Sequence, residues 1–138
     1  MDMKAVRERL IEHEGLKLEM YKCTSDYWTI GVGRNIETRG ISIETAMQML
    51  DEDIEIVHTE LQSTLEGFSD MPIPVQEALV DLAFNMGTPT LRSFKRCLQA
   101  LKEREWAIAS DELLDSRYAK QVGQRAITIA NMIRNCES

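Results

Sequence analysis

Three side chains that can take part in catalysis stand at fixed spacing near the start of the chain. Glu14 is followed nine residues later by Cys23, and Thr29 comes six residues after that. A carboxylic acid can donate a proton, a thiol can deprotonate water or attack carbon, and a hydroxyl can hold a water by hydrogen bonds. Cleavage of a glycosidic bond requires such a set, an acid for the leaving oxygen and a base or nucleophile on the other face of the sugar.

The pattern around these residues changes from helix to strand. Residues 2–14 carry a narrow apolar stripe at helical spacing, and Gly15 is the residue expected just past a helix end. Apolar residues then alternate over 16–20, and the polar residues 23–26 favour a turn. Residues 27–32 are rich in aromatic and β-branched side chains, which is typical of a strand. The sequence therefore predicts a helix followed by a β-hairpin.

The second strand of this hairpin has two unlike faces. The apolar face is expected to pack inward and consists of Trp28, Ile30 and Val32. The other face carries Thr29, Gly31 and Gly33. Glycine inside a strand often marks a close approach by a ligand or another backbone, although it can also serve only to bend the sheet. With Thr29 on the same face and Glu14 just upstream, we expect Gly31 and Gly33 to border a substrate groove.

These residues resemble the catalytic stretch of phage-type lysozymes, the endolysins related to the T-even phage lysozyme and grouped as glycoside hydrolase family 24. The family pattern is a glutamate, eight residues, an aspartate or cysteine, five residues and a threonine. The matching segments here are Glu14-Gly15-Leu16, Tyr21-Lys22-Cys23 and the run from Tyr27 to Gly33. Weaker similarity extends to Arg125. The resemblance implies a mostly α-helical α+β fold with two lobes, a small hairpin lobe and a helical lobe, and an active site in the cleft between them.

The resemblance also implies roles for the three residues. Glu14 would be the general acid, and the negative end of the helix dipole suits a carboxyl group that must hold a proton. Cys23 stands where relatives usually have aspartate, which holds or activates the attacking water with inversion. A thiol is a poorer base near neutral pH, and a neighbouring Glu14 anion would raise the pKa of Cys23 further. Direct attack by the thiolate with retention, or a structural cysteine, are the alternatives. Thr29 would hydrogen-bond the water.

Further site residues are carried over from the family to the second half of the chain. Arg125, in Gly-Gln-Arg-Ala, would pair with Glu14 and hold its side chain. Asn85, in Phe-Asn-Met-Gly, matches a cleft-lining amide, although a polar residue at a helix end is an equal interpretation. Ser116 and Arg117 resemble a further substrate-binding pair beside the cleft.

The rest of the chain is predicted to be helical within one lysozyme-like domain, residues 1–138. Its parts are a hairpin lobe with the first helix (1–41), a linking helix (42–66) and a helical lobe (67–138). An ion pair between Arg34 and Asp53 could fix the hairpin to the linking helix. In the helical lobe, helices are expected around 74–86, 91–101, 106–113 and 126–133. Segments expected to lack regular structure are 34–40, 67–74, 88–90 and 117–123.

Composition narrows the class of protein. A length of 138 residues suits one globular domain, and a net charge of −7 argues against a nucleic-acid partner. The three cysteines and two histidines show no metal-ligand spacing, and no cofactor is implied. Residues 1–13 are charged and amphipathic, unlike a signal peptide, and no apolar run could span a bilayer. Together with these features, the resemblance to phage lysozymes implies a monomer that is made in the host cytoplasm and reaches the cell wall through a membrane lesion.

The function implied by the resemblance is that of a muramidase. Such an enzyme hydrolyses the β-1,4 bond between N-acetylmuramic acid and N-acetylglucosamine in bacterial peptidoglycan, and a phage endolysin of this kind lyses the host cell. A chitinase-like or transglycosylase activity on a related glycan is one alternative. A catalytically weakened protein that binds cell walls with a lysozyme fold is another, and cysteine at position 23 is the feature that supports it.

Overall fold

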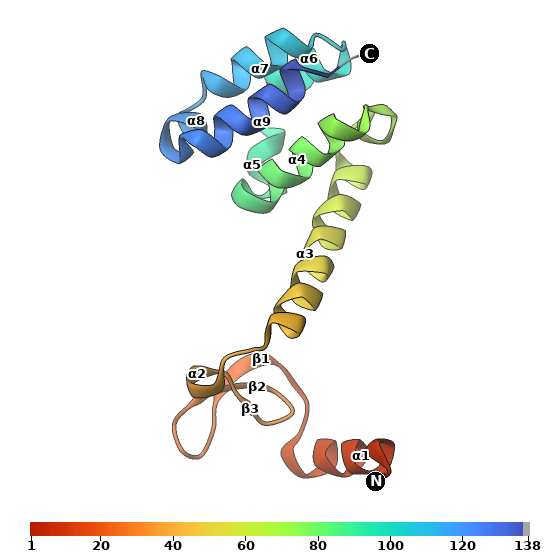
Figure 1. Ribbon diagram of the computed structural model, residues 1–138, viewed down its shortest axis with the longest axis vertical. Coiled ribbons are helices and arrows are strands. Elements are labelled where there is room, and N and C mark those ends of the chain that lie inside the picture. The colour runs from red at the N-terminus through yellow and green to blue at the C-terminus, as the bar shows by residue number, and fades with distance from the viewer. Residues whose placement is uncertain (137–138) are drawn as a thin grey trace. The chain divides into compact units, whose positions relative to one another are not determined.

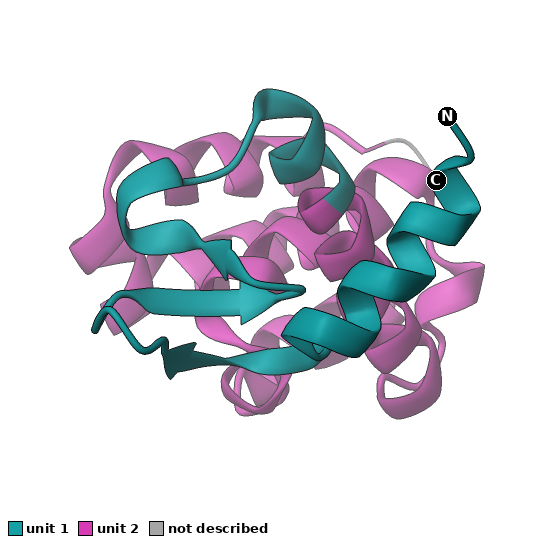
Figure 2. Ribbon diagram, turned by 90° about the horizontal axis from the view of Figure 1, so that it is seen from below, with its two compact units in different colours: residues 1–48 teal, residues 49–138 magenta. Residues whose placement is uncertain are grey.

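The computed structural model describes residues 1–136 and divides into two compact units, residues 1–48 and 49–138 (Figure 2). Unit 1 holds a helix, a small sheet and a one-turn helix, and unit 2 is helical (Figure 1). This composition confirms the predicted α+β class with helix dominant. The long helix α3 (Ile43–Thr64) begins in unit 1 and ends in unit 2.

Unit 1 begins with helix α1 (Met3–Glu14), as predicted. Asp2 caps its first turn, because the side-chain oxygen accepts a hydrogen bond from the Ala5 N–H at 3.2 Å. Gly15 ends the helix with φ of 78°, a backbone conformation that favours glycine, and its N–H donates to the Ile11 carbonyl at 2.8 Å. Glu14 is thus fixed as the last residue of the helix.

The sheet of unit 1 has three antiparallel strands rather than the two of the predicted hairpin. They are ordered β1 (Lys17–Lys22), β2 (Trp28–Gly31) and β3 (Arg34–Asn35). The expectation that residues 34–40 lack regular structure is therefore wrong, because they form β3 and the short helix α2 (Ile36–Arg39). The Asn35 side chain caps α2 by accepting from the Thr38 N–H, a local bond that composition alone did not reveal.

The expected inward face of β2 is also wrong at its first residue. Trp28 is 40% exposed, whereas Thr29 on the opposite face is only 3% exposed. Among residues 1–48, all of which the structure describes, no apolar side chain is buried, so the indole has no core to enter. The Lys22 ammonium instead lies 4.6 Å from the centre of the Trp28 ring, a cation–π contact that covers one face of it.

Helix α3 starts where the sequence predicted. The Ser42 hydroxyl accepts a hydrogen bond from the Thr45 N–H at 3.1 Å, which caps the first turn, and Glu44 adds a negative charge there. The helix runs for 22 residues. Only Leu61, near its C-terminal end, is fully buried, so most of α3 contributes little to the core.

Unit 2 contains the remaining helices. In order these are the short 3-10 helix η1 (Phe68–Asp70), α4 (Ile73–Met86), α5 (Thr88–Arg92), α6 (Lys95–Lys102), α7 (Trp106–Leu114), α8 (Arg117–Val122) and α9 (Gln124–Arg134). The predicted helices at α4, α7 and α9 are confirmed. The predicted helix over 91–101 is wrong, because the segment is split between α5 and α6. The segments 67–74 and 117–123 were wrongly expected to lack regular structure: the first contains η1 and the start of α4, and the second contains α8. Pro89 lies in the first turn of α5 instead of breaking the chain.

The hydrophobic core lies wholly in unit 2. Helices α7 and α9 pack together, and α6 and α4 pack on them. The largest fully buried apolar side chains are Phe68, Leu61, Leu79, Leu82, Leu91, Leu101, Leu113, Ile129, Ile133 and Val75. This core holds α4, α8 and α9 in a fixed arrangement, and each of these helices carries one or more polar residues considered below.

Candidate functional site

Glu14 lies against the turn between β2 and β3. A Cβ atom built on Gly33 would stand 2.8 Å from Glu14 Oε2 and 3.2 Å from its Cδ. The carboxylate therefore occupies the space that a side chain at position 33 would take. Gly33 also has φ of +65°, so both its backbone conformation and its neighbour favour glycine. A ligand or another backbone was expected close to Gly33, and the neighbour that the structure shows is the side chain of Glu14.

Cys23 begins the turn that joins β1 to β2. The Asp26 N–H donates to the Cys23 carbonyl at 2.9 Å, and the Cys23 N–H donates to the Tyr27 carbonyl at 3.0 Å. Asp26 has φ of 66°, a left-handed conformation that aspartate tolerates better than most residues. This is the geometry of a type I turn closed by one left-handed residue. It fixes the Cys23 backbone at the end of the sheet.

The turn also changes the acidity of the thiol. Hydrogen bonding from the backbone of Tyr27 lowers the pKa of Cys23 below its ordinary value, and it outweighs the effect of burial. Smaller contributions from the backbone of Ser25 and the hydroxyl of Thr29 act in the same direction. The expectation of a raised pKa is therefore wrong. The sequence showed the charge of Glu14 but not the donors that the turn brings to the sulfur.

Thr29 is placed beside Cys23 by the register of the sheet. Thr29 pairs with Tyr21 across β1 and β2, and Cys23 stands two residues beyond Tyr21, so Cys23 and Thr29 lie on the same face. The Thr29 hydroxyl donates to the Tyr27 carbonyl at 2.8 Å. Since a hydroxyl has one proton, Thr29 donates either to this carbonyl or to the Cys23 sulfur, and in both cases its lone pairs can accept from a water.

Gly31 and Arg34 are the other two site residues predicted in unit 1. Gly31 has φ of +71°, and no atom lies within 4 Å of the place where a Cβ atom would stand, so that face is open to a ligand. Arg34 is half-buried in β3 and pairs through its backbone with Ile30. Its predicted partner Asp53 is exposed on α3 and belongs to unit 2. The Arg34–Asp53 ion pair stays a prediction.

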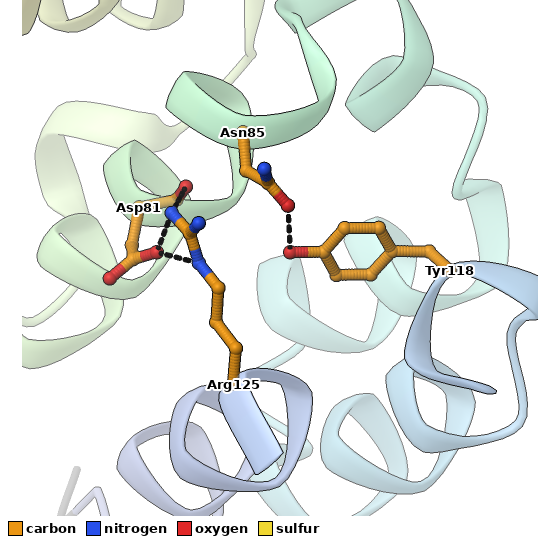
Figure 3. Close-up of polar contacts among 4 residues, drawn as sticks. All are labelled: Asp81, Asn85, Tyr118 and Arg125. Carbon is orange, nitrogen blue, oxygen red and sulfur yellow. Dashed lines mark hydrogen bonds and ion pairs between the residues drawn. The ribbon is translucent and has the colours of Figure 1, made fainter. Parts of the chain in front are cut away.

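In unit 2, four polar side chains from three helices form two hydrogen-bonded pairs (Figure 3). Arg125 of α9 donates from Nε and Nη2 to Asp81 Oδ1, at 2.9 and 2.6 Å, and from Nη2 to the Asp81 carbonyl at 3.2 Å. The Tyr118 hydroxyl of α8 donates to Asn85 Oδ1 at 2.7 Å. Asp81 and Asn85 stand one turn apart on α4, which places both on the same face of that helix.

The Tyr118–Asn85 bond determines what Asn85 can offer. The pKa of Tyr118 is raised above its ordinary value, chiefly by burial. The charge of Arg125 opposes this increase and the charge of Asp81 adds to it. The hydroxyl therefore remains a hydrogen-bond donor at neutral pH. Because Asn85 Oδ1 accepts this bond and the residue is exposed, its amide N–H groups are the ones presented to solvent. Asn85 can thus donate to a carbonyl or hydroxyl oxygen of a ligand.

The remaining predicted residues of unit 2 are partly engaged in the fold. Ser116 caps α8 by accepting from the Ala119 N–H at 3.1 Å, and its hydroxyl donates to the Leu113 carbonyl at 2.6 Å. Arg117 is exposed at the first position of α8. The pairing of Arg125 with Glu14 joins residues of different units and stays a prediction, and the partner that the structure shows is Asp81.

Asp81 and Tyr118 were not among the residues predicted from the sequence. Their positions lie 44 and 33 residues from their partners, so no local pattern joins them. One signal was present, because Asp81 and Asn85 are polar residues spaced four apart in the apolar second half of α4. Among residues 1–136, no group of three His, Cys, Asp or Glu side chains could hold a metal ion. Within the same residues, no helix is long and apolar enough to cross a membrane.

Comparisons with known proteins match this chain to lysozymes. The family model described as phage lysozyme matches residues 11–134. A relative in Dictyostelium discoideum, "Probable T4-type lysozyme 1", is 26% identical over 161 residues, covering 95% of this chain and 94% of the relative. A second from the same organism, "Probable T4-type lysozyme 2", is 28% identical over 154 residues, covering 90% of each chain. The matched segment includes Glu14, Cys23, Thr29 and all the polar residues of Figure 3.

Proposed function

Since the chain belongs to the phage lysozyme family, we propose that it is a muramidase that hydrolyses the β-1,4 bond between N-acetylmuramic acid and N-acetylglucosamine in peptidoglycan. Family membership supports a glycosidase that acts on peptidoglycan. The choice of bond, the residues and the stereochemistry are our proposal. It assigns the chemical step to Glu14, Cys23 and Thr29, all of which lie in unit 1.

The proposed reaction is a single displacement by water. Glu14, protonated, donates its proton to the glycosidic oxygen as the bond to the anomeric carbon breaks. The Cys23 thiolate accepts a proton from a water molecule, whose oxygen bonds to the anomeric carbon from the opposite face. Thr29 orients this water by accepting a hydrogen bond, since its own proton is donated to the Tyr27 carbonyl. The products are an inverted hemiacetal, a free sugar hydroxyl, a Glu14 carboxylate and a Cys23 thiol, and proton exchange with water restores the starting state.

The observation that carries this assignment is the acidity of Cys23. A thiol in the place of the usual aspartate would weaken the enzyme if it stayed protonated at neutral pH. The backbone of Tyr27 lowers the pKa of this thiol, so thiolate is present at lower pH than for an ordinary cysteine. This supports an active enzyme over a weakened wall-binding protein. It also leaves direct attack by the thiolate as the second mechanism to be tested.

Unit 2 is proposed to contribute substrate contacts. The exposed amide N–H groups of Asn85 are suited to a sugar carbonyl or hydroxyl oxygen. Arg117 is exposed at the start of α8 and can meet a carboxylate of the glycan. Ser116 already donates and accepts within the fold, so we assign it the role of capping α8 beside Arg117.

The first experiment measures clearing of purified peptidoglycan and identifies the products. We expect products with a reducing N-acetylmuramic acid end and the mass of one added water. A transglycosylase would give products lighter by one water, a chitinase would cleave chitin oligomers, and a binding protein would clear nothing. Glu14→Gln should abolish clearing with an unchanged melting temperature, because the amide has no acid proton to give. Glu12→Gln, a nearby exposed change on α1, is the matched control and should remain active.

The anomeric form of the first product separates the two mechanisms. Proton NMR recorded before mutarotation should show the α anomer if water attacks directly, because the substrate bond is β. A β anomer would establish retention, which is the outcome of direct attack by the Cys23 thiolate, and it would reject the water mechanism. Protein mass spectrometry during turnover should then show no sugar adduct if inversion is correct.

We also propose that the enzyme acts as an endolysin, made in the cytoplasm of a bacterial host and admitted to the wall by a membrane lesion. The resemblance to phage lysozymes supports this role, although the two relatives above are from Dictyostelium discoideum. Expression in a bacterium should leave the culture intact until chloroform permeabilises the membrane, and lysis should follow within minutes. Lysis without a permeabilising agent would contradict the proposed route.

A further inference from the structure

The seven glycines of the chain share one property and differ in another. All have positive φ, so backbone conformation alone explains glycine at each position. Only Gly33 also has an atom that an added side chain would strike, because Glu14 Oε2 lies 2.8 Å from its Cβ position. Five of the others have nothing within 4 Å, and Gly87 has only a Pro89 carbon at 3.9 Å.

We propose that Gly33 is a positioning residue for the acid Glu14, and that the missing side chain at position 33 is what allows the carboxylate to lie where it does. The inference rests on the proposed function for the role of Glu14. It differs from the expectation that Gly33 contacts substrate, because here Gly33 acts on the reaction through the acid.

The energetics favour an effect on catalysis over an effect on folding. The atom in the way is the far end of a flexible side chain, so Glu14 can rotate aside at little cost to the fold. The same rotation moves the proton donor away from the glycosidic oxygen. A misplacement of about 1 Å can reduce a catalysed rate by about 10²-fold. A residue at position 33 with a Cβ atom should therefore leave a folded but slow enzyme.

Gly40 supplies a matched control. It lies in the same unit, it has φ of +62°, close to the +65° of Gly33, and nothing lies within 4 Å of its Cβ position. Gly40→Ala also strains a backbone with positive φ, at ψ of −150°, without the contact to Glu14. We expect both Gly33→Ala and Gly40→Ala to lower the melting temperature. Only Gly33→Ala should reduce kcat, by about 10²-fold, with KM changed by less than about threefold.

Two further variants keep the test decisive if Gly33→Ala folds poorly. Asparagine tolerates positive φ better than alanine, so Gly33→Asn adds the Cβ atom with less backbone strain, with Gly40→Asn as its control. Glu14→Asp shortens the acid and withdraws it from position 33. The loss of kcat in the double variant Glu14→Asp/Gly33→Ala should then be close to that of Glu14→Asp alone. Such a coupling would not arise from a general weakening of the fold.

A spectroscopic measurement tests the proposal without activity. The carboxyl carbon of Glu14 can be assigned by NMR from the signal that Glu14→Gln removes. We expect this signal to shift in Gly33→Ala and to stay in place in Gly40→Ala. An unmoved signal, a kcat equal to that of Gly40→Ala, or a rise in KM alone would overturn the proposal, the last because it marks a substrate contact. Full activity of Glu14→Gln would instead reject the proposed acid role of Glu14. The NMR test of whether position 33 moves the Glu14 carboxyl group would still be valid in that case.

Discussion

The two units of this protein divide folding and chemistry between them. Among the described residues, every buried apolar side chain belongs to residues 49–138, and residues 1–48 bury only Thr29. Yet the proposed acid, base and water-binding residues all lie in residues 1–48. In unit 1, caps, a closed turn and a short sheet ladder fix the backbone of the site. The comparison teaches that local hydrogen bonds can hold the proposed catalytic residues in a unit whose own apolar side chains are not buried.

The thiols of Cys23 and Cys97 differ in the same way, since one lies in each unit and their pKa values shift in opposite directions. Cys23 is half-buried in unit 1, and hydrogen bonding from the Tyr27 backbone lowers its pKa. Cys97 is only 2% exposed in unit 2, and burial, with a smaller effect of the Glu112 charge, raises its pKa to about 12. Its thiol donates a weak hydrogen bond to the Ala109 carbonyl at 3.4 Å. The first environment favours the thiolate, and the second favours the neutral thiol.

The largest expected difference between the units is in thiol reactivity. At pH 7 the thiolate population of Cys23 should exceed that of Cys97 by at least about 10³-fold, because each pKa unit is a factor of ten. Iodoacetamide followed by peptide mass mapping should modify Cys23 long before Cys97, and lysis should be lost at the rate of Cys23 modification. Urea at unfolding concentration is the control, since it should make the two rates similar. Equal rates in the folded protein would contradict the comparison.

The next largest effect concerns Cys23 as a base. Cys23→Ala should reduce lysis by about 10²-fold or more, because water then has no proton acceptor. Cys23→Asp should remain active. Activity falls when the base becomes protonated as pH decreases, and aspartate, with a pKa near ~3.9, is protonated at lower pH than the thiol. The acid limb of the pH–rate profile should therefore move to lower pH in Cys23→Asp. If Cys23→Ala is as active as the wild type, Cys23 has no catalytic role.

The sequence predicted those elements of the fold that short local patterns determine. The spacing from Glu14 to Thr29, the glycine after α1 and the Ser42 cap each contain their own physical cause within a few residues, and each element starts or ends as expected. The core helix α4 was likewise evident from its apolar spacing. Short elements were missed when one side-chain bond decides them, as with the Asn35 cap of α2 and the Ser116 cap of α8.

The proposed site residues were chosen from their types and spacing, and their contacts could not be derived in the same way. At position 23, the sign of the pKa shift depends on backbone donors that the turn assembles. At position 33, the neighbouring atom could be named only once the fold was known. In unit 2, the partners of Arg125 and Asn85 come from distant parts of the chain, so that only packing of α4, α8 and α9 brings them together.

Truncation of a leucine in each unit tests where stability resides. Leu79 is fully buried in α4, whereas Leu18 in β1 is 83% exposed. Leu79→Ala should lower the free energy of unfolding by about 2–5 kcal/mol, from lost burial and the cavity left behind. Leu18→Ala should change it by less than about 0.5 kcal/mol. Urea titration followed by circular dichroism measures both. A comparable loss in Leu18→Ala would show that unit 1 depends on apolar burial after all.

The smallest expected effect comes from two of the buried hydroxyls, one taken from each unit. Thr29 in unit 1 donates to the Tyr27 carbonyl, whereas Ser110 in α7 is fully buried and its hydroxyl has no hydrogen-bond partner among the described residues. Burying a hydroxyl costs free energy unless a hydrogen bond compensates. Ser110→Ala removes that cost and also favours helix, so it should stabilise the protein by roughly 1 kcal/mol.

Thr29→Val provides the opposite case, because it deletes a hydroxyl that is satisfied. We expect a loss of about 1 kcal/mol in the free energy of unfolding, since the Tyr27 carbonyl then lacks its side-chain donor. It should also move the acid limb of the pH–rate profile to higher pH, because the Thr29 hydroxyl helps to lower the pKa of Cys23. Ser110→Ala should leave that profile unchanged. If both substitutions shift stability in the same direction, hydrogen-bond satisfaction does not distinguish the two sites, and helix propensity alone would account for the gain at position 110.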